Sequence, residues 1–313
     1  MIQRPCPICG FRKTSRVEAV ENKRDMGGSP LRIASCASCG GVFQPVIFDN
    51  AALAEWYDYM GRESSNVKMT ALLRRRLERT VKSFEHHRVT NRLLEVGCGG
   101  GLFVQAAVEC GWEVYGTELS PSCCAVLRPL LGSQLYQGDL REAPFERASF
   151  DVVVMMELIE HLPDPAPYLV ATHRLLRPGG CLVLTTPNLS GVSGRVWGRK
   201  WRVMNDEHLN YFDRRTIRRL LVDHGYNDVT VGTSGFDVGV YAKVLKSTLS
   251  RLRWRPSPAA TVNYVEQKPV SGSENQFVVS VVDFAMEVAN PILSLFSLGD
   301  VLKVRARKPS SLS

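Results

Sequence analysis

The chain has 313 residues, of which 44% are hydrophobic and 22% are charged, and these values predict a globular protein with one large and one small domain. No apolar run reaches the roughly 18–20 residues that span a bilayer, and the first residues lack the apolar core of a signal peptide. We therefore expect a cytoplasmic protein whose nine cysteines are metal ligands or buried small residues rather than disulfides. The net charge of +8 suits an anionic partner.

Two Cys-x-x-Cys-Gly motifs dominate residues 1–48. The first contains Cys6 and Cys9 and the second contains Cys36 and Cys39, with about 26 residues between the two pairs. Four thiolates at this spacing are typical of a tetrahedral Zn²⁺ site. Because four cysteines leave no open position for water, we expect zinc to be structural, in a small ribbon-like module. Metal binding would supply much of the folding free energy of so small a module.

Residues 49–90 are expected to form a helical connector, with one helix over Met69–His87. A short apolar run over residues 93–96 then predicts a buried strand. A glycine-rich turn and a helix over residues 102–110 follow it, which is the opening of a nucleotide-binding βαβ unit. The next predicted strand ends at Glu118, whose carboxylate could accept hydrogen bonds from both hydroxyls of a ribose. At this point NAD and S-adenosylmethionine are both open as ligands.

Three further features favour S-adenosylmethionine. Glu95 lies inside the first strand, and Asp139 ends a third short strand, where an acid could meet an adenine amino group. The motifs E-x-G-C-G-x-G and F-D-x-V-x-x-x-x-x-x-E-H then occur in this order, before the segment Leu175–Gly180. In these blocks the chain resembles the class I S-adenosylmethionine-dependent methyltransferases, and more closely their small-molecule branch. The resemblance covers residues 92–226.

This resemblance implies an α/β fold, a Rossmann-like seven-stranded sheet in a domain over residues 91–313. Strands are expected near residues 93–96, 113–117, 134–137, 150–156, 181–186, 227–231 and 300–307. The last of them is expected to run antiparallel between the fifth and the sixth. Two insertions, over residues 190–212 and 243–297, are additions to the minimal fold. The second insertion is expected to pack on the core, or to contact a membrane surface or another subunit.

The resemblance also implies a cofactor site at the carboxyl edge of the first four strands. Glu118 is expected to hold the ribose, Asp139 the adenine, and the turn over residues 97–101 the methionine part. The full set of residues expected at the cofactor is Glu95, Gly97, Cys98, Gly99, Gly101, Glu118, Leu119, Asp139, Leu140, Met156 and Glu157. Tyr57 and Tyr59 precede this domain, and either cover the cofactor or pack the cysteine module onto the core.

Methyl transfer is an in-line attack that depends on alignment, with a base where the nucleophile must lose a proton. His208 and His161 are the candidate bases, although either could be an ordinary hydrogen-bonding histidine. The aromatic residues of the first insertion are expected to form the acceptor pocket; they are Trp197, Trp201, Tyr211 and Phe212. Basic residues beside them could meet a diphosphate; they are Arg195, Arg199, Lys200 and Arg202.

Two functions follow from this pattern. The first is methylation of a small, phosphorylated metabolite such as a nucleotide-linked sugar, at a carbon, oxygen or nitrogen atom. The alternative is an RNA methyltransferase that uses the cysteine module and Arg74–Arg76 as a binding platform. Basic residues are spread along the chain rather than concentrated on one element, so there is no strong nucleic-acid signal.

Overall fold

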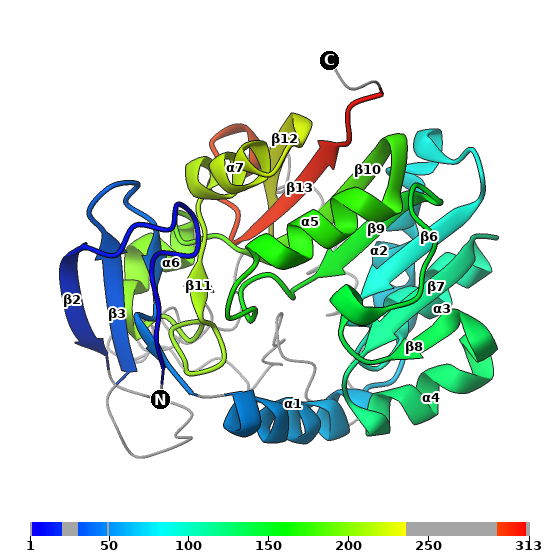
Figure 1. Cartoon of the computed structure of the whole chain (residues 1–313), viewed down its shortest axis with the longest axis horizontal. Helices are drawn as coiled ribbons and strands as arrows, with labels where there is room; N and C mark the ends of the chain where they lie inside the picture. Colours follow the sequence, from blue (N-terminus) through cyan, green and yellow to red (C-terminus); the bar gives the residue numbers. More distant parts are fainter. Residues whose placement is uncertain (1, 21–30, 49, 236–292, 311–313) are drawn as a thin grey trace, which may run out of the picture.

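The protein is built around a seven-stranded sheet with helices on both faces (Figure 1). The computed structural model describes residues 2–20, 31–48, 50–235 and 293–310. The strand order is β12-β13-β10-β9-β6-β7-β8. The strands are β6 (Arg92–Val96), β7 (Glu113–Glu118), β8 (Leu135–Gln137), β9 (Phe150–Met156), β10 (Leu176–Pro187), β12 (Asn227–Ser234) and β13 (Val301–Arg307). The predicted Rossmann-like seven-stranded sheet is confirmed.

The final strand, β13, is the only strand of this sheet that runs against both of its neighbours. It pairs antiparallel with β10 on one side and with β12 on the other, whereas β6, β7, β8, β9 and β10 are mutually parallel. This is the position predicted for the seventh strand. The parallel strands are covered on both faces, which explains why β9 is an almost unbroken apolar run that is buried over its first six residues.

Two hydrophobic clusters cover the two faces of the sheet. One includes residues of α5 (Ala166–Leu175) and α7 (Arg214–Asp223), and the other includes residues of α2 (Ala71–Lys82), α3 (Leu102–Glu109) and α4 (Pro121–Leu131). Two of these helices begin with side-chain caps. Ser120 accepts a hydrogen bond from the backbone N–H of Cys123 at the start of α4, and Asp213 forms a capping box with Thr216 at the start of α7.

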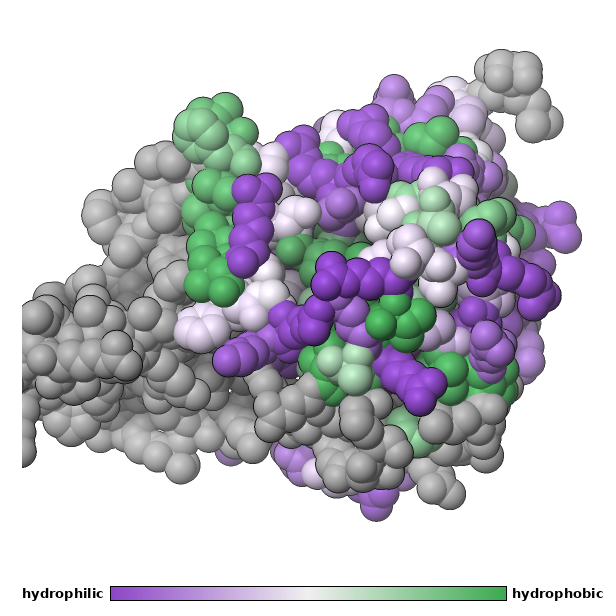
Figure 2. All heavy atoms as spheres, turned by 90° about the vertical axis from the view of Figure 1, so that its left-hand side faces the viewer, coloured by the Kyte–Doolittle hydropathy of each residue, from purple (hydrophilic) through white to green (hydrophobic). Residues whose placement is uncertain are grey.

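The cysteine module contains two small sheets and shares the larger core. One sheet pairs β1 (Ile2–Gln3) with β5 (Val46–Ile47), and the other contains β2 (Thr14–Val20), β3 (Leu31–Cys36) and β4 (Val42–Phe43). Buried residues of the module, Phe43 among them, belong to the same hydrophobic cluster as the central sheet. Figure 2 shows hydrophilic and hydrophobic residues interspersed on the face of the molecule that carries this module.

The first insertion completes the second of these small sheets, which the sequence did not indicate. Its strand β11 (Asn210–Tyr211) pairs antiparallel with β4, giving the order β11-β4-β3-β2. A short helix, α6 (Val192–Trp197), precedes it. Trp201 and Tyr211 are buried against Val20, Leu31 and other residues of the module. The prediction that the insertion's aromatic residues form an acceptor pocket is therefore wrong for these two, because they pack the insertion onto the cysteine module.

The connector between the module and the sheet contains two helices, α1 (Asn50–Ser65) and α2. The single helix predicted over Met69–His87 is shorter than expected. It ends at Lys82 with Ser83 as its C-cap, and a 3₁₀ turn over Glu85–His87 follows. Helix α1 lies close to the start of α4, where a Cβ on Gly61 would stand 2.1 Å from the Ser120 hydroxyl oxygen. Glycine at position 61 therefore permits this close approach.

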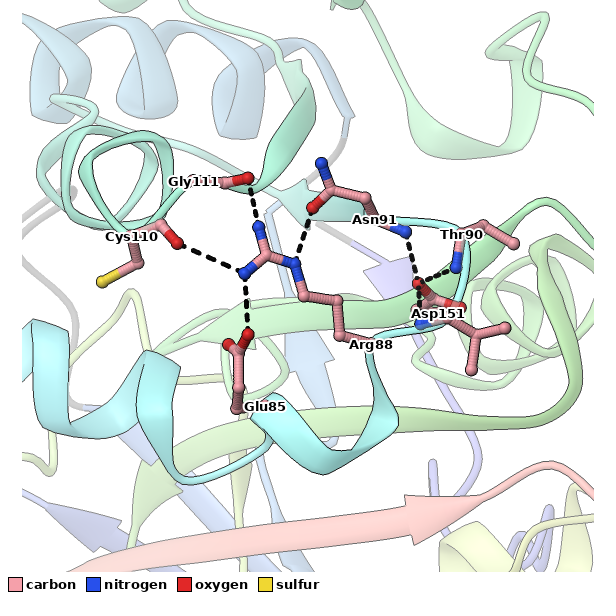
Figure 3. A network of polar contacts seen from close by, with 8 residues as sticks. Glu85, Arg88, Thr90, Asn91, Cys110, Gly111 and Asp151 are labelled. Atoms are coloured by element: carbon pink, nitrogen blue, oxygen red, sulfur yellow. Dashed lines mark hydrogen bonds and ion pairs between the residues drawn. The ribbon is translucent and has the colours of Figure 1, made fainter.

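The buried carboxylate of Asp151 connects the end of this connector to the sheet by hydrogen bonds, at the edge opposite the glycine turn (Figure 3). Asp151, the second residue of β9, accepts hydrogen bonds from the backbone N–H groups of Val89, Thr90 and Asn91 at 2.7–2.8 Å. Its other oxygen accepts one from Arg177 at 2.5 Å. Burial opposes ionisation of Asp151, but these donors lower its pKa below the usual value.

The second predicted insertion, over residues 243–297, falls outside the described residues except for its last five, so its predicted core, membrane or subunit contact remains a prediction. Within the described part of the chain, no helix combines the length and the apolar character that crossing a bilayer requires.

Candidate functional site

A cavity of about 270 Å³ opens at the carboxyl edge of the parallel strands. Residues at and after the carboxyl ends of β6, β7, β8 and β9 line it, and the remaining walls come from helix α1, the starts of α4 and α5, and Glu207 of the first insertion. The predicted cofactor residues that line it are Gly97, Gly99, Glu118, Leu119, Asp139, Leu140 and Glu157. Such an edge is where ligands bind in open α/β sheets.

Where the glycine turn lines the cavity, it presents backbone atoms, because its glycines have no side chains. Gly97 has a φ of +71° and Gly99 a φ of +50°, values that side-chain-bearing residues rarely adopt. A Cβ on Gly97 would also lie 3.0 Å from the Leu158 side chain. The turn leads directly into α3, whose N-terminal N–H groups point toward the same edge of the sheet.

Glu118 is held at the cavity wall by two backbone groups. One carboxylate oxygen accepts a hydrogen bond from the N–H of Gly99, and the other accepts one from the N–H of Ser120, each at 2.8 Å. A carboxylate offers about four acceptor positions. Glu118 therefore retains capacity on both oxygens for two further donors, such as the hydroxyls of a ribose.

Asp139 has more partners than Glu118. Its oxygens accept hydrogen bonds from the backbone and guanidinium of Arg141 at 2.8 Å and from the hydroxyl of Tyr168 at 2.5 Å. Burial opposes ionisation, but these donors lower the pKa of Asp139. Because four donors use its acceptor positions, Asp139 can accept a bond from an adenine amino group only if one of them moves.

Four predicted cofactor residues support the cavity without lining it; they are Glu95, Cys98, Gly101 and Met156. Glu95 is buried, and burial together with the nearby Glu118 raises its pKa well above the usual value. The Cys98 sulfur packs behind the turn against Gly116, where an added Cβ would lie 2.6 Å from it.

Helix α1 closes one side of the cavity. The Ser64 hydroxyl accepts a hydrogen bond from the N–H of Gly100 at 3.1 Å, and a Cβ on Gly100 would stand 2.4 Å from the Ser64 carbonyl oxygen. Tyr57 lines the cavity and donates a hydrogen bond to the carbonyl of His161 at 2.7 Å. Tyr59 is half-exposed and does not line the cavity, so only Tyr57 occupies the position predicted for a covering residue.

The two candidate bases meet beside the cavity. His161 lines it, and the His208 ring, which is buried, lies edge-on to the His161 ring at 4.7 Å between centroids. Two glutamates lie close to these histidines: Glu157 lines the cavity, and Glu160 is grouped with both imidazole rings. Burial raises the pKa of Glu157, and burial together with the charge of Glu157 raises the pKa of Glu160 well above the usual range.

Sequence reasoning missed several residues of the cavity; they are Gly61, Ser64, Leu158, Leu162, Pro163, Tyr168 and Glu207. Leu158 and Leu162 flank the E-H pair, so their closeness to that motif was a usable signal. Ser64, Tyr168 and Glu207 reach the cavity from other elements, and no local pattern marks them.

The basic residues of the first insertion do not line the cavity. Arg199 is half-exposed and forms an ion pair with Glu18 of the cysteine module, and Arg195 donates to the carbonyl of Ser190 at 2.8 Å. The expectation that these basic side chains border the acceptor pocket is therefore wrong for the cavity that the described residues form, although Glu207 of the same insertion lines it. Phe212 is likewise fully buried in the core rather than exposed to the cavity.

The four cysteines of the two motifs come together as predicted. Their sulfur atoms all lie within 4.8 Å of one another, with 3.6 Å between Cys6 and Cys39 and between Cys9 and Cys36. Burial opposes ionisation of Cys36, but backbone N–H groups of Cys39 and Ser38 lower its pKa to about 7. Arg215 of α7 donates to the Cys39 carbonyl at 2.9 Å, which places a positive charge beside the cluster.

The strand order, the glycine turn and the acidic residue at the end of β7 together define a class I S-adenosylmethionine-dependent methyltransferase domain. The chain belongs to the methyltransferase-domain family, because a family model of that description matches residues 66–231, more than half of its length. The matched region begins after the cysteine module.

Curated relatives share the central part of the chain. A ubiquinone biosynthesis O-methyltransferase of Cereibacter sphaeroides is 34% identical over 121 residues, which are 35% of this chain and 49% of that protein. One from Pseudomonas aeruginosa is 38% identical over 106 residues, which are 31% of this chain and 44% of that protein. The chain thus spans about half the length of the curated relatives it matches.

Solved structures show a similar fold at low identity. An S-adenosylmethionine-dependent methyltransferase from Archaeoglobus fulgidus has a TM-score of 0.49 and 19% identity, covering 83% of this chain and 100% of that one. Phosphoethanolamine N-methyltransferase 2 from Haemonchus contortus, in complex with S-adenosylmethionine, has a TM-score of 0.46 and 20% identity, covering 75% of this chain and 52% of that one.

Proposed function

We propose that the protein transfers a methyl group from S-adenosylmethionine to a small-molecule acceptor. The observation that carries this proposal is the Glu118 carboxylate, fixed by the N–H groups of Gly99 and Ser120 at the cavity wall with acceptor capacity to spare on both oxygens. In this arrangement the ribose hydroxyls bind Glu118, and the methionine part lies along the Gly97–Gly101 turn near the N-terminus of α3.

The adenine is placed between apolar side chains beyond Glu118. Leu119 and Leu140 line that part of the cavity, and Asp139 lies just after β8 beside them. An adenine amino group that reached Asp139 would replace one of its present donors, either Arg141 or Tyr168.

The acceptor is proposed to react through an oxygen atom. The support comes from the curated relatives, which are named as O-methyltransferases. His161 is the candidate base that lines the cavity, and His208 lies behind it. The finer prediction, a phosphorylated acceptor such as a nucleotide-linked sugar, is supported only by the net charge of +8, because the basic side chains of the first insertion do not line the cavity.

The test of this function is methyl transfer from labelled S-adenosylmethionine to a panel of nucleotide-linked sugars, phenols, lipids and RNA. We expect turnover with one of the small molecules and none with RNA. Transfer to RNA alone would favour the alternative prediction, in which the cysteine module is an RNA platform. If the protein binds S-adenosylmethionine but methylates none of these acceptors, the result would contradict methyl transfer to these kinds of molecule.

The cysteine cluster is proposed to hold one structural Zn²⁺. Tetrahedral bonds of about 2.3 Å place sulfur atoms roughly 3.8 Å apart, close to the 3.6 Å found within each facing pair. Backbone N–H groups of Ser38 and Gly41 point at the sulfurs of Cys36 and Cys39, as thiolates require. The prediction of a cytoplasmic protein agrees with nine unpaired cysteines and stays a prediction.

Replacing Cys36 with serine is expected to remove most of the bound zinc, because one thiolate of four is lost. Elemental analysis of the purified protein should give one zinc per chain for the unchanged protein and well below one for the variant. Cys110→Ser is the matched control, since Cys110 lies outside the module and should leave zinc content unchanged. A chain without zinc, or a Cys36→Ser protein with a full equivalent, would contradict the site.

A further inference from the structure

A buried carboxylate beside the cavity lacks the partners that such a group requires. Glu160 is 1% exposed, and within the described part of the chain no donor stands in good hydrogen-bond geometry to either carboxylate oxygen, although the Thr186 hydroxyl is near enough to lower its pKa against the larger effect of burial. A buried charge without a partner costs several kcal/mol of solvation free energy, in round terms. Native proteins keep such a group only where a proton, a cation or a ligand completes it.

A second carboxylate makes the requirement stronger. Glu157, three residues earlier in the sequence, lies against Glu160, and one of its oxygens is also buried without a hydrogen bond in the described residues. Two carboxylates in contact repel each other unless they share a proton or a positive ion. Glu157 sits at a φ of +48°, and the hydroxyl and carbonyl of Thr185 hold its backbone N–H there.

Two imidazoles face the same point. One ligand atom from each of Glu160, His161 and His208 lies within 4.8 Å of the other two. The Nδ1 of His161 is 2.8 Å from the carbonyl oxygen of Glu207, which can only accept, so Nδ1 carries the proton. In the neutral ring, this hydrogen bond leaves the lone pair on Nε2, and it is the arrangement that orients histidine ligands in metal sites.

Hydrogen bonds between segments that are distant in the sequence hold the backbone around these residues. The carbonyl of Glu160 accepts from the N–H groups of Leu209 and Asn210, at 2.8 and 3.0 Å. The amide of Asn210 donates to the carbonyls of Ile159 and Leu162. Gln44 of the cysteine module donates to the carbonyl of His208 at 2.9 Å. Two segments nearly fifty residues apart are thus locked together where the four side chains meet.

We propose that Glu160, His161 and His208 bind a divalent first-row transition-metal ion, with Glu157 as the fourth ligand. Metal–ligand bonds of about 2.1 Å keep any two ligand atoms within roughly 4.2 Å, so the 4.8 Å spread closes with a shift of about half an ångström. Two carboxylates neutralise the charge of the ion, and imidazole with carboxylate is a ligand set that suits Zn²⁺, Fe²⁺ and Mn²⁺.

The position of this ion bears on the acceptor. Glu157 and His161 line the cavity, so the ion lies at its edge, where an acceptor hydroxyl could contact it and have its pKa lowered. The two histidines would then act on the acceptor through the ion rather than as bases. Only this consequence rests on the proposed methyl transfer; the binding of the ion does not.

The test is a titration of the purified full chain with Mn²⁺, in which the signal of free Mn²⁺ is followed by electron paramagnetic resonance. Thiolate ligands do not favour Mn²⁺, so the cysteine cluster does not interfere. We expect one saturable site per chain, and at least a roughly tenfold weaker affinity in Glu160→Gln and in His208→Gln. His86→Ala is the matched control, because His86 is exposed and lies on a different turn.

Circular dichroism and S-adenosylmethionine affinity establish that each variant is folded. If Glu160→Gln does not fold, the test is the Mn²⁺ affinity of His208→Gln compared with that of the unchanged chain. Absence of saturable binding of Mn²⁺ and, in parallel calorimetry, of a second Zn²⁺ would mean that Glu157 and Glu160 share a proton, and would overturn the proposal. Affinity equal to that of the unchanged chain in both variants would overturn it too. The readout is ion binding, so a failed methyl-transfer assay would not affect the outcome of this test, and a failed ion titration would not affect the proposed methyl transfer.

Discussion

Replacing Glu118 with alanine is expected to weaken S-adenosylmethionine binding by roughly ten- to a hundredfold, which corresponds to about 1.5–3 kcal/mol. The carboxylate is fixed at both oxygens by the N–H groups of Gly99 and Ser120, so the ribose finds its acceptors already in position. Alanine removes both acceptors. It also leaves those two N–H groups without their carboxylate partner, which adds to the loss.

Isothermal titration calorimetry on the unchanged protein and the variant measures this effect. Glu113→Ala is the matched control, since Glu113 stands at the opposite end of the same strand, is exposed, and should leave the affinity unchanged. A Glu118→Ala protein that binds S-adenosylmethionine as tightly as the unchanged chain would refute the assignment of Glu118 to the ribose.

The largest effect on stability is expected for Asp151→Ala, at about 3–5 kcal/mol of the free energy of unfolding. Asp151 is fully buried and accepts bonds from three consecutive backbone N–H groups and from Arg177 (Figure 3). Its removal leaves the Arg177 guanidinium and the N–H groups of Val89–Asn91 without an acceptor. The connector would then lose its attachment to β9.

Urea unfolding of the two proteins at neutral pH checks this value, and Glu146→Ala is the control, because Glu146 is largely exposed and pairs only loosely with Arg92 at 3.6 Å. The pKa of Asp151 is lowered in the fold, so its contribution is present above the unfolded value of about 3.9 and is lost as pH falls through the folded value. The difference between the proteins should therefore shrink below about pH 4. A difference under about 1 kcal/mol at neutral pH would contradict the role of Asp151.

The central sheet could be predicted from the sequence because its signals are local. Short apolar runs and the glycine turn each depend on neighbouring residues, and the structure has them at the expected positions. The acidic ends of the strands could be predicted for the same reason. Parallel strands bring their carboxyl ends to one edge, so Glu118 and Asp139 had to share a site once the strand order was right.

The remainder depends on contacts between distant segments, which no local pattern encodes. Trp201 and Tyr211 had the composition of an acceptor pocket, but they fill the core of the cysteine module, whose sheet needs β11 as its edge. Arg199 similarly meets Glu18 rather than a substrate. Tyr168 reaches Asp139 from the next helix, and Ser64 reaches the glycine turn from α1, because tertiary packing brings these helices there.

The most direct test of the central claim is calorimetric binding of S-adenosylmethionine and of NAD to the unchanged protein under the same conditions. Both ligands carry a ribose and an adenine that could hydrogen-bond to Glu118 and Asp139. A difference in affinity between them therefore reports on the methionine part, which is expected beside the glycine turn. The account predicts one S-adenosylmethionine site per chain and far weaker binding of NAD. Tighter binding of NAD, or no detectable S-adenosylmethionine binding to folded protein, would contradict it.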